Sequence, residues 1–413
     1  MLYQEIKKCR ICNNAHLETI IDLGNQALTG VFPALGEIVE EGPLKLVKCM
    51  GDDACGLVQL GHDYDMQKLY GDNYGYRSGL NKSMIEHLCG IVKKIEGTAN
   101  LQNGDLVIDI AGNDGVLLGA YSNKNLELVS IDPTSGKFKE YFASHVKYIP
   151  DFFSSKIVKD KYGDKKAKVI SSIAVFYDLP APMEIMQQIY DILDDQGIWV
   201  AEQSYMPMMI DNTSYDTICH EHLEYYALKQ FKWMADNVGF KIIDIEFNDT
   251  NGASFCLTFA KKGSGFKEKT AEIEKILLEE ESRGFNALDI YKEFEKNVER
   301  NKEDLLQFFK KTKQEGKKVF GYGASTKGNV ILQYCKITPE EMPYIAEVNE
   351  YKFGRFTPGT RIAIISEKEA RKMKPDYFMV LPWHFKNGIV KRENEYITSG
   401  GHLIFPLPKI EVV

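Results

Sequence analysis

The sequence predicts an α/β protein in which a small cysteine-rich amino-terminal domain is followed by two Rossmann-like α/β domains. Three observations lead to this prediction: four of the eight cysteines fall within the first 55 residues, short apolar segments alternate with helix-like segments from residue 106, and the alternation returns after residue 318. Strands and helices that alternate in this way form parallel sheets covered by helices. We therefore expect domains at residues 1–80, 81–265 and 266–413.

Length and composition limit the classes of protein to which the chain can belong. A chain of 413 residues is too long for one ordinary core, and 44% hydrophobic with 27% charged residues is typical of a folded enzyme. The 51 basic and 59 acidic residues give a net charge of −8 without a long basic run, which argues against nucleic-acid binding and favours a small-molecule substrate. No apolar stretch reaches the roughly 20 residues that span a bilayer, and the first residues lack a signal-peptide pattern. We expect a cytoplasmic monomer or small homo-oligomer without a membrane partner.

The clustered cysteines predict a metal site. Cys9 and Cys12 form a close pair, and Cys49 and Cys55 form a second, wider pair. Four thiolates can close a tetrahedral Zn²⁺ site, and such a site adds folding free energy to a segment too small for a large core. Because four protein ligands leave no open coordination position, we expect structural zinc without a catalytic role. The alternatives are a redox-active first pair, or cysteines that are only buried.

The middle segment has the pattern of a doubly wound sheet. Apolar residues at helical spacing run from Lys82 to Glu96, and short apolar strands follow. The expected strands are Leu106–Ile110, Leu128–Ile131, Val169–Ile173 and Ile198–Ala201. Their separation leaves room for the crossover connections that parallel strands require.

Small and acidic residues at the ends of consecutive strands predict a nucleoside site. These residues are Asp109 near the end of the first strand, Ala111, Gly112 and Asn113 in the turn after it, Asp132 after the second strand, and Asp151 with Phe152 after a strand that precedes Val169–Ile173. Small residues let a ligand approach the backbone, and a carboxylate at the second position can accept both hydroxyls of a ribose. The Gly-x-Gly-x-x-Gly fingerprint of dinucleotide sites is absent. The three positions together predict binding of S-adenosylmethionine.

The last segment repeats the α/β pattern after two predicted helices. A Lys- and Glu-rich stretch from about Phe266 to Gly316 has apolar residues every three or four positions, which predicts two long, mostly solvated helices. Strands are expected at Lys318–Gly321, Tyr377–Leu381 and Leu403–Phe405.

A glycine-containing turn after the first of these strands predicts an anion site. It includes Gly323 and leads through Ser325 and Lys327 into a helix, so that backbone N–H groups and a lysine can hold a diphosphate. The residues expected to complete this pocket are Asn329, Lys352, Trp383 and His384. A structural turn with a solvated lysine is the alternative.

The cysteine cluster, the turn at Asp109–Gly115 and the segments Ser214–Tyr226 and Gly321–Asn329 together resemble the three-domain sugar methyltransferases. That family uses S-adenosylmethionine to methylate nucleotide-linked deoxyketosugars at carbon. The resemblance covers essentially the whole chain, in the order zinc domain, methyltransferase domain and carboxy-terminal α/β domain. It implies that the last domain holds a nucleotide-linked sugar.

The segment His220-Glu221-His222 contains the candidate base for this reaction. Methylation beside a ketone requires a base matched to neutral pH and groups that stabilise an enolate oxygen. Histidine suits the first role, and Glu221 can orient an imidazole or raise its pKa. The alternatives are metal binding by the two histidines, or histidines buried for structural reasons.

The resemblance assigns roles to individual residues, and at two positions this chain differs from some members of the family. It implies that His222 is the base and that Tyr76 assists it, and we place Tyr74, Arg77 and His220 among the substrate-binding residues. Some members of the family have a tyrosine where this chain has Cys219 and a histidine near the position of Tyr177, which we expect to help stabilise the enolate.

These differences keep two other activities open. Methylation of a sugar hydroxyl needs only a base and in-line geometry, so a sugar-nucleotide O-methyltransferase is the main alternative. A nicotinamide-dependent sugar-nucleotide reductase is the second.

Overall fold

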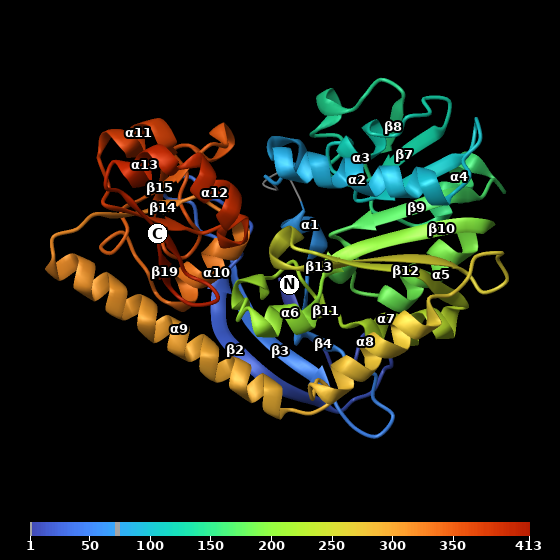
Figure 1. The fold of residues 1–413 in the computed structure, drawn as a ribbon, viewed down its shortest axis with the longest axis horizontal. Coiled ribbons are helices and arrows are strands. Elements are labelled where there is room, and N and C mark those ends of the chain that lie inside the picture. Colours follow the sequence, from blue (N-terminus) through green and yellow to red (C-terminus); the bar gives the residue numbers. More distant parts are fainter. Residues whose placement is uncertain (1, 71–74) are drawn as a thin grey trace.

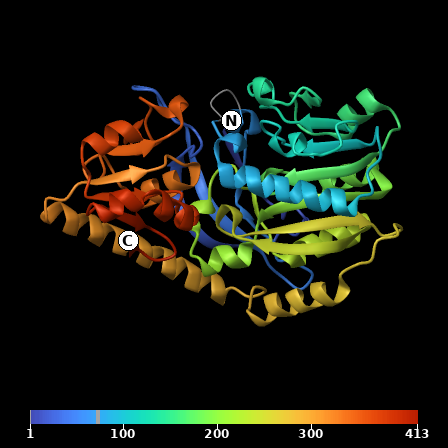
Figure 2. The ribbon, with the colours of Figure 1, turned by 45° about the horizontal axis from the view of Figure 1, so that its top comes forward.

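The computed structural model describes residues 2–70 and 75–413. Two α/β bodies stand side by side, an antiparallel sheet from the amino-terminal part lies along their junction, and a long helix runs beneath one of them (Figure 1). The turned view in Figure 2 shows the same separation of the two bodies. Within the described residues, no helix combines the length and the apolar character needed to cross a bilayer.

The amino-terminal sheet includes a strand from much later in the chain. Its order is β11-β4-β3-β2, all antiparallel, and β11 pairs Glu224 with Gln59 and Tyr225 with Val58. The elements of this part are β1 (Tyr3–Glu5), β2 (Leu17–Ala27), β3 (Glu41–Cys49), β4 (Val58–Leu60), β5 (His62–Tyr64), α1 (Met66–Leu69) and β11 (Glu224–Tyr225). Because β11 follows the His220-Glu221-His222 segment, this pairing holds that segment against the amino-terminal sheet.

The middle body is a twisted sheet of order β12-β13-β10-β9-β6-β7-β8. The strands β10, β9, β6, β7 and β8 are parallel, and β13 is antiparallel to both of its neighbours. The strand bounds are β6 (Leu106–Ile110), β7 (Glu127–Ile131), β8 (Val146–Ile149), β9 (Ala167–Ile173), β10 (Leu193–Ser204), β12 (Phe240–Asn248) and β13 (Ser254–Lys261). The helices are α2 (Lys82–Thr98), α3 (Val116–Gly119), α4 (Ser155–Tyr162), α5 (Pro182–Ile192), α6 (Met206–Asp211) and α7 (Leu228–Val238).

The strands expected from the sequence are found at their predicted places. The first matches exactly at Leu106–Ile110, where every residue is buried. The fourth is longer than predicted, because Leu193–Ser204 pairs with β9 on one side and with β13 on the other. Pairing with β13 keeps the polar end of this strand, which includes Glu202 and Gln203, in the sheet.

Two helices form the predicted connector. They are α8 (Thr270–Ser282) and α9 (Asp289–Gln314). The buried residues of α9 include Tyr291, Phe294, Val298 and Leu305, spaced three, four and seven positions apart, which is the spacing of one helix face. The opposite face is charged and exposed, so α9 runs along the surface of the molecule (Figure 1).

The carboxy-terminal body is a second, mostly parallel sheet of order β16-β15-β14-β17-β18-β19. Its strands are β14 (Val319–Tyr322), β15 (Tyr344–Glu347), β16 (Ala363–Ser366), β17 (Tyr377–Val380), β18 (His402–Phe405) and the antiparallel β19 (Glu411–Val412). Its helices are α10 (Thr326–Tyr334), α11 (Glu367–Lys372), α12 (Lys386–Arg392) and α13 (Asn394–Thr398). The α/β class expected from the sequence is therefore confirmed.

Candidate active site

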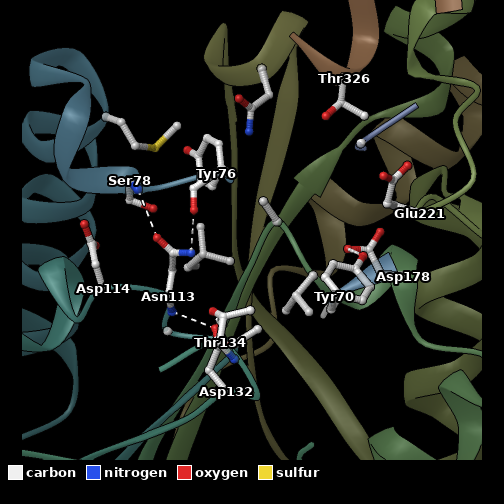
Figure 3. A pocket seen from close by; sticks show the side chains of 18 of the residues that line it. Tyr70, Tyr76, Ser78, Asn113, Asp114, Asp132, Thr134, Asp178, Glu221 and Thr326 are labelled. Carbon is white, nitrogen blue, oxygen red and sulfur yellow. Dashed lines mark hydrogen bonds between the residues drawn. The ribbon is translucent and has the colours of Figure 1, made fainter. Parts of the chain in front are cut away.

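A cavity of about 390 Å³ opens between the three parts of the molecule. Its walls come from the loop after β2, from the carboxyl ends of β6, β7 and β9, and from the start of α10 (Figure 3). Ligand pockets commonly form at such strand ends and between domains, and this volume suits a small-molecule ligand.

The turn after β6 forms one wall of the cavity. Ala111 and Asn113 both have the left-handed backbone conformation, with φ of 57° and 52°. Asp132 stabilises the turn from the end of β7, because its Oδ2 accepts a hydrogen bond from the Asn113 N–H at 2.8 Å. Its Oδ1 accepts from the N–H and the hydroxyl of Thr134, both at 2.6 Å. The turn therefore presents backbone and a fixed carboxylate to the cavity, an arrangement suited to a nucleoside ligand.

Asp109, near the end of β6, lines the cavity beside this turn. Its buried carboxyl accepts a hydrogen bond from the Ser171 hydroxyl at 2.6 Å, and burial, together with nearby Asp132, raises the pKa of Asp109 to about 7. A Cβ at Gly112 would lie 2.7 Å from Oδ2 of Asp109 and 2.6 Å from Oγ of Ser130. Glycine is therefore required at this position for steric reasons.

The chain from Tyr76 to Gly79 lies across the same turn (Figure 3). Oδ1 of Asn113 accepts from the Ser78 N–H at 3.0 Å, and the Asn113 amide donates to the Tyr76 carbonyl at 3.2 Å. Oδ2 of Asp114 accepts from the Gly79 N–H at 2.9 Å. These bonds hold the Tyr76 side chain at the cavity, where it remains 49% exposed.

His222 lies on the opposite wall with a defined protonation pattern. Its Nδ1 donates to the Thr217 carbonyl at 2.8 Å, which leaves Nε2 as the unprotonated nitrogen of a neutral ring. The Tyr177 ring packs against the imidazole edge, with centroids 4.5 Å apart. Burial, with a smaller effect of nearby Lys327, lowers the pKa of His222 to about 3. The neutral imidazole therefore has a lone pair available at the cavity.

The two neighbours of His222 differ in their surroundings. Glu221 lines the cavity, accepts from the Thr29 hydroxyl at 3.3 Å, and has its pKa raised by burial. His220 is fully buried away from the cavity: its Nδ1 accepts from the Thr29 N–H at 3.3 Å and its Nε2 donates to the Gly42 carbonyl at 3.3 Å. This placement corresponds to the buried structural interpretation of His220 and not to a substrate contact.

Two lysines from the carboxy-terminal body reach the cavity. Lys327, in the first turn of α10, donates to the Asn251 carbonyl at 2.8 Å, and Lys352 donates to the Ala324 carbonyl at 2.7 Å. Burial lowers the pKa of both amines. Ser325 caps the helix by accepting from the Gly328 N–H at 3.0 Å. Two cations beside a helix amino terminus suit an anionic ligand.

The remaining predicted residues fall into two groups. Phe152 and His384 line the cavity, whereas Asp151, Arg77, Gly323, Asn329 and Trp383 do not. Arg77 pairs with Asp114 at 3.4 Å, Asn329 donates to the Thr29 carbonyl at 2.8 Å, and the Trp383 indole donates to Asp216 at 2.8 Å. Tyr74 lies outside the residues that the structure describes.

The structure also adds residues that the sequence analysis missed. Tyr70, Asp178, Glu202 and Asn251 line the cavity. Asp178 directly follows Tyr177, but neither residue spacing nor a sequence motif distinguished its carboxyl from a surface carboxyl. Asn251 was not distinguishable either, because its contact depends on the approach of the carboxy-terminal body.

The four amino-terminal cysteines meet at one point, as the sequence predicted. Their sulfur atoms all lie within 4.8 Å of one another, with Cys9 and Cys55 3.4 Å apart and Cys12 and Cys49 3.5 Å apart. A tetrahedral zinc ion with Zn–S bonds of about 2.3 Å holds its sulfur ligands about 3.8 Å apart. The donor set and its dimensions therefore fit Zn²⁺.

Comparison with known proteins gives three matches in the order of the chain. A family described as "putative zinc binding domain" matches residues 9–70, a methyltransferase domain matches residues 80–245, and a C-methyltransferase C-terminal domain matches residues 249–408. The chain is also 27% identical to C-methyltransferase NovU of Streptomyces niveus over 420 residues, which cover 100% of this chain and 98% of that protein.

Solved structures resemble part of the chain. The plantazolicin methyltransferase BpumL in complex with SAH is 12% identical, with a TM-score of 0.34 over 42% of this chain and 82% of that chain. LepI in complex with SAM is 16% identical, with a TM-score of 0.34 over 47% of this chain and 57% of that chain. Both TM-scores are low, so these structures indicate nothing about the substrate.

Proposed function

The chain belongs to the three-domain, zinc-containing C-methyltransferases that use S-adenosylmethionine, and from this premise we propose its acceptor. The acceptor is a nucleotide-linked deoxyketosugar, and the methyl group is transferred to a carbon next to the ketone. The name of the similar Streptomyces protein supports transfer to carbon. The sugar-nucleotide substrate is supported by the resemblance of the sequence motifs and by the cavity itself.

The observation that carries the proposal is the state of His222. Its Nδ1 proton is bound to the Thr217 carbonyl, so Nε2 is free to take a proton from a ligand in the cavity. Carbon next to a ketone reacts with an electrophile only after it loses a proton, and the unprotonated Nε2 of the neutral ring can accept that proton. Glu221 beside it carries negative charge when ionised and would favour the imidazolium that forms.

The methyl donor would bind at the cavity wall opposite His222. Asp132 and the Ala111–Asn113 turn would hold the adenosine part, and Phe152 lies beside them at the cavity. S-adenosylmethionine supplies an already activated methyl group, so this part of the protein mainly aligns donor and acceptor.

The lysines of the carboxy-terminal body would hold the diphosphate of the substrate. Lys327 and Lys352 donate to backbone carbonyls in the structure, and a diphosphate oxygen would be a stronger, charged acceptor for both. Because Lys327 also lies close enough to affect the pKa of His222, a diphosphate at Lys327 would bring the attached sugar near the base.

The test uses the full-length enzyme with S-adenosylmethionine and nucleotide-linked deoxyketosugars in D₂O. We expect a product with a new carbon-bound methyl group, unchanged hydroxyls and the α-hydrogen lost, as read by mass spectrometry and NMR. His222→Asn should lower the rate by about 10²–10⁴ while both ligands still bind. The matched control is His402→Asn, which changes an exposed histidine on β18.

Two results would replace this proposal. A methyl ether with the α-hydrogen retained would identify an O-methyltransferase, for which Cys219 and Tyr177 would mark the change of acceptor. Consumption of NADH or NADPH without methyl transfer would identify a reductase.

A further inference from the structure

Two carboxyl groups lie in the cavity wall near His222. Asp178 ends the short 3₁₀ helix Phe176–Asp178 that follows β9, and Glu221 precedes His222 in the chain. Both line the cavity, and Tyr70 from the end of α1 lies beside Asp178 (Figure 3). The proposed reaction assigns no role to Asp178.

The two oxygens of Asp178 have different surroundings. Oδ2 accepts a hydrogen bond from the Tyr70 hydroxyl at 2.7 Å. Oδ1 is buried and has no hydrogen-bond partner among residues 2–70 and 75–413, and the residue as a whole is only 6% exposed. A buried polar atom without a partner is costly, so in a side chain that lines a cavity it indicates a hydrogen bond that a bound ligand completes.

The Tyr70 hydrogen bond favours one position for a proton on Asp178. No ion pair to Asp178 occurs within the described part of the chain, and burial raises the pKa of its carboxyl well above the usual value. The Tyr70 hydrogen bond lowers this pKa and the Glu221 charge raises it further. The neutral form is therefore favoured, and because Oδ2 already receives the Tyr70 hydrogen, the proton of the neutral form lies on Oδ1.

Taking the proposed function as its basis, we propose that Oδ1 of Asp178 donates a hydrogen bond to the ketone oxygen of the acceptor. The bond strengthens as His222 removes the α-proton and negative charge develops on that oxygen. No proton is transferred from Asp178, because the enolate collapses back to a ketone when its carbon takes the methyl group. A neutral carboxylic acid in an apolar site is an effective donor of this kind.

The surroundings of the base fit this role. Tyr177, the residue before Asp178, packs its ring on the His222 imidazole. One short helix therefore carries both the neighbour of the base and the proposed donor, and Asp178 and His222 line the same cavity.

The test compares two substitutions of Asp178 in the full-length enzyme. Asp178→Asn keeps an N–H donor at the Oδ1 position and an oxygen for Tyr70, whereas Asp178→Leu removes both. The assay follows exchange of the α-hydrogen in D₂O by NMR, with S-adenosylhomocysteine bound so that no methyl transfer occurs. We expect Asp178→Leu to slow exchange by about 10²–10³ and Asp178→Asn to slow it much less, with affinity for S-adenosylhomocysteine unchanged in both.

A second readout does not depend on the leucine variant folding. Infrared spectra of a ¹³C-labelled ketone substrate should show a higher carbonyl stretching frequency on Asp178→Asn than on the wild type, because the amide is the weaker donor. An unchanged frequency would overturn the inference. Exchange at the wild-type rate in Asp178→Leu, or equal losses in both variants, would also overturn it.

Failure of the proposed function would look different. The wild-type enzyme would then show no α-hydrogen exchange with any nucleotide-linked ketosugar. The assignment of Asp178 to a ketone would be rejected with it, before any variant is compared.

Discussion

Asp132 offers the sharpest test of the methyl-donor site. Its carboxylate accepts three hydrogen bonds, one from the Asn113 N–H and two from Thr134, and it lies at the cavity. Asp132→Asn keeps the shape but replaces one acceptor oxygen with an NH₂ group. The NH₂ group of the asparagine then points either at a hydrogen-bond donor of the turn or at a ribose hydroxyl of the ligand, where the carboxylate oxygen had accepted a hydrogen bond.

The expected loss follows from one hydrogen bond to a charged group. Such a bond contributes about 1.5–3 kcal/mol, which corresponds to binding that is weaker by about 10- to 150-fold. The turn itself should also become less stable, by about 2–4 °C in unfolding temperature for each kcal/mol lost in a domain of this size. Calorimetric titration with S-adenosylhomocysteine, well below the unfolding temperature of each variant, measures the affinity.

Asp151→Asn is the matched control. Asp151 follows the next strand, but its side chain is exposed, accepts from the Phe152 N–H at 2.8 Å, and does not line the cavity. A surface change of this kind should alter the binding free energy by no more than about 0.5 kcal/mol. Equal effects of the two substitutions, or no effect of Asp132→Asn, would refute the assignment of Asp132 to the ribose.

Two further predictions concern the metal and pH. Elemental analysis of protein purified without chelator should find one zinc per chain, and Cys12→Ser should lose this zinc together with the unfolding cooperativity of the amino-terminal sheet; a zinc-free protein that folds normally would contradict this. Burial lowers the pKa of His220 to about 4, so the folded state binds a proton at His220 less tightly than the unfolded state does. The contribution of the neutral His220 to the free energy of unfolding is therefore complete above pH 6.5 and decreases as the pH falls towards 4. The difference in unfolding free energy between wild type and His220→Gln should therefore shrink by about 1.4 kcal/mol per pH unit over that range in denaturant titrations, and a constant difference would show that His220 is not held neutral.

The sequence predicted those parts of the fold that local pattern determines. Leu106–Ile110 is apolar except for Asp109 and is buried throughout, so its strand could be predicted to the residue. The pairing of Glu224–Tyr225 with β4 could not, because a two-residue strand has no periodicity and its partner is far away in the chain.

The candidate site was predictable to a similar extent. Asp132 and His222 follow from strand ends and from a motif, whereas the burial of His220 against Thr29 and Gly42 depends on how the amino-terminal sheet packs. The unpartnered oxygen of Asp178 likewise results from tertiary packing and has no sequence signal.

The late strand of the amino-terminal sheet has a consequence for how the protein is made. During synthesis, β2, β3 and β4 leave the ribosome long before Glu224 and Tyr225 do, so the edge of β4 stays unpaired while the methyltransferase body is translated. An unpaired strand edge is open to pairing with other chains. Arg10 lies between Cys9 and Cys12 in the sequence, and its guanidinium donates to the Leu223 carbonyl at 3.2 Å. This hydrogen bond also cannot form until Leu223 has been made. The amino-terminal sheet can therefore be complete only after the segment that carries His222 has been made.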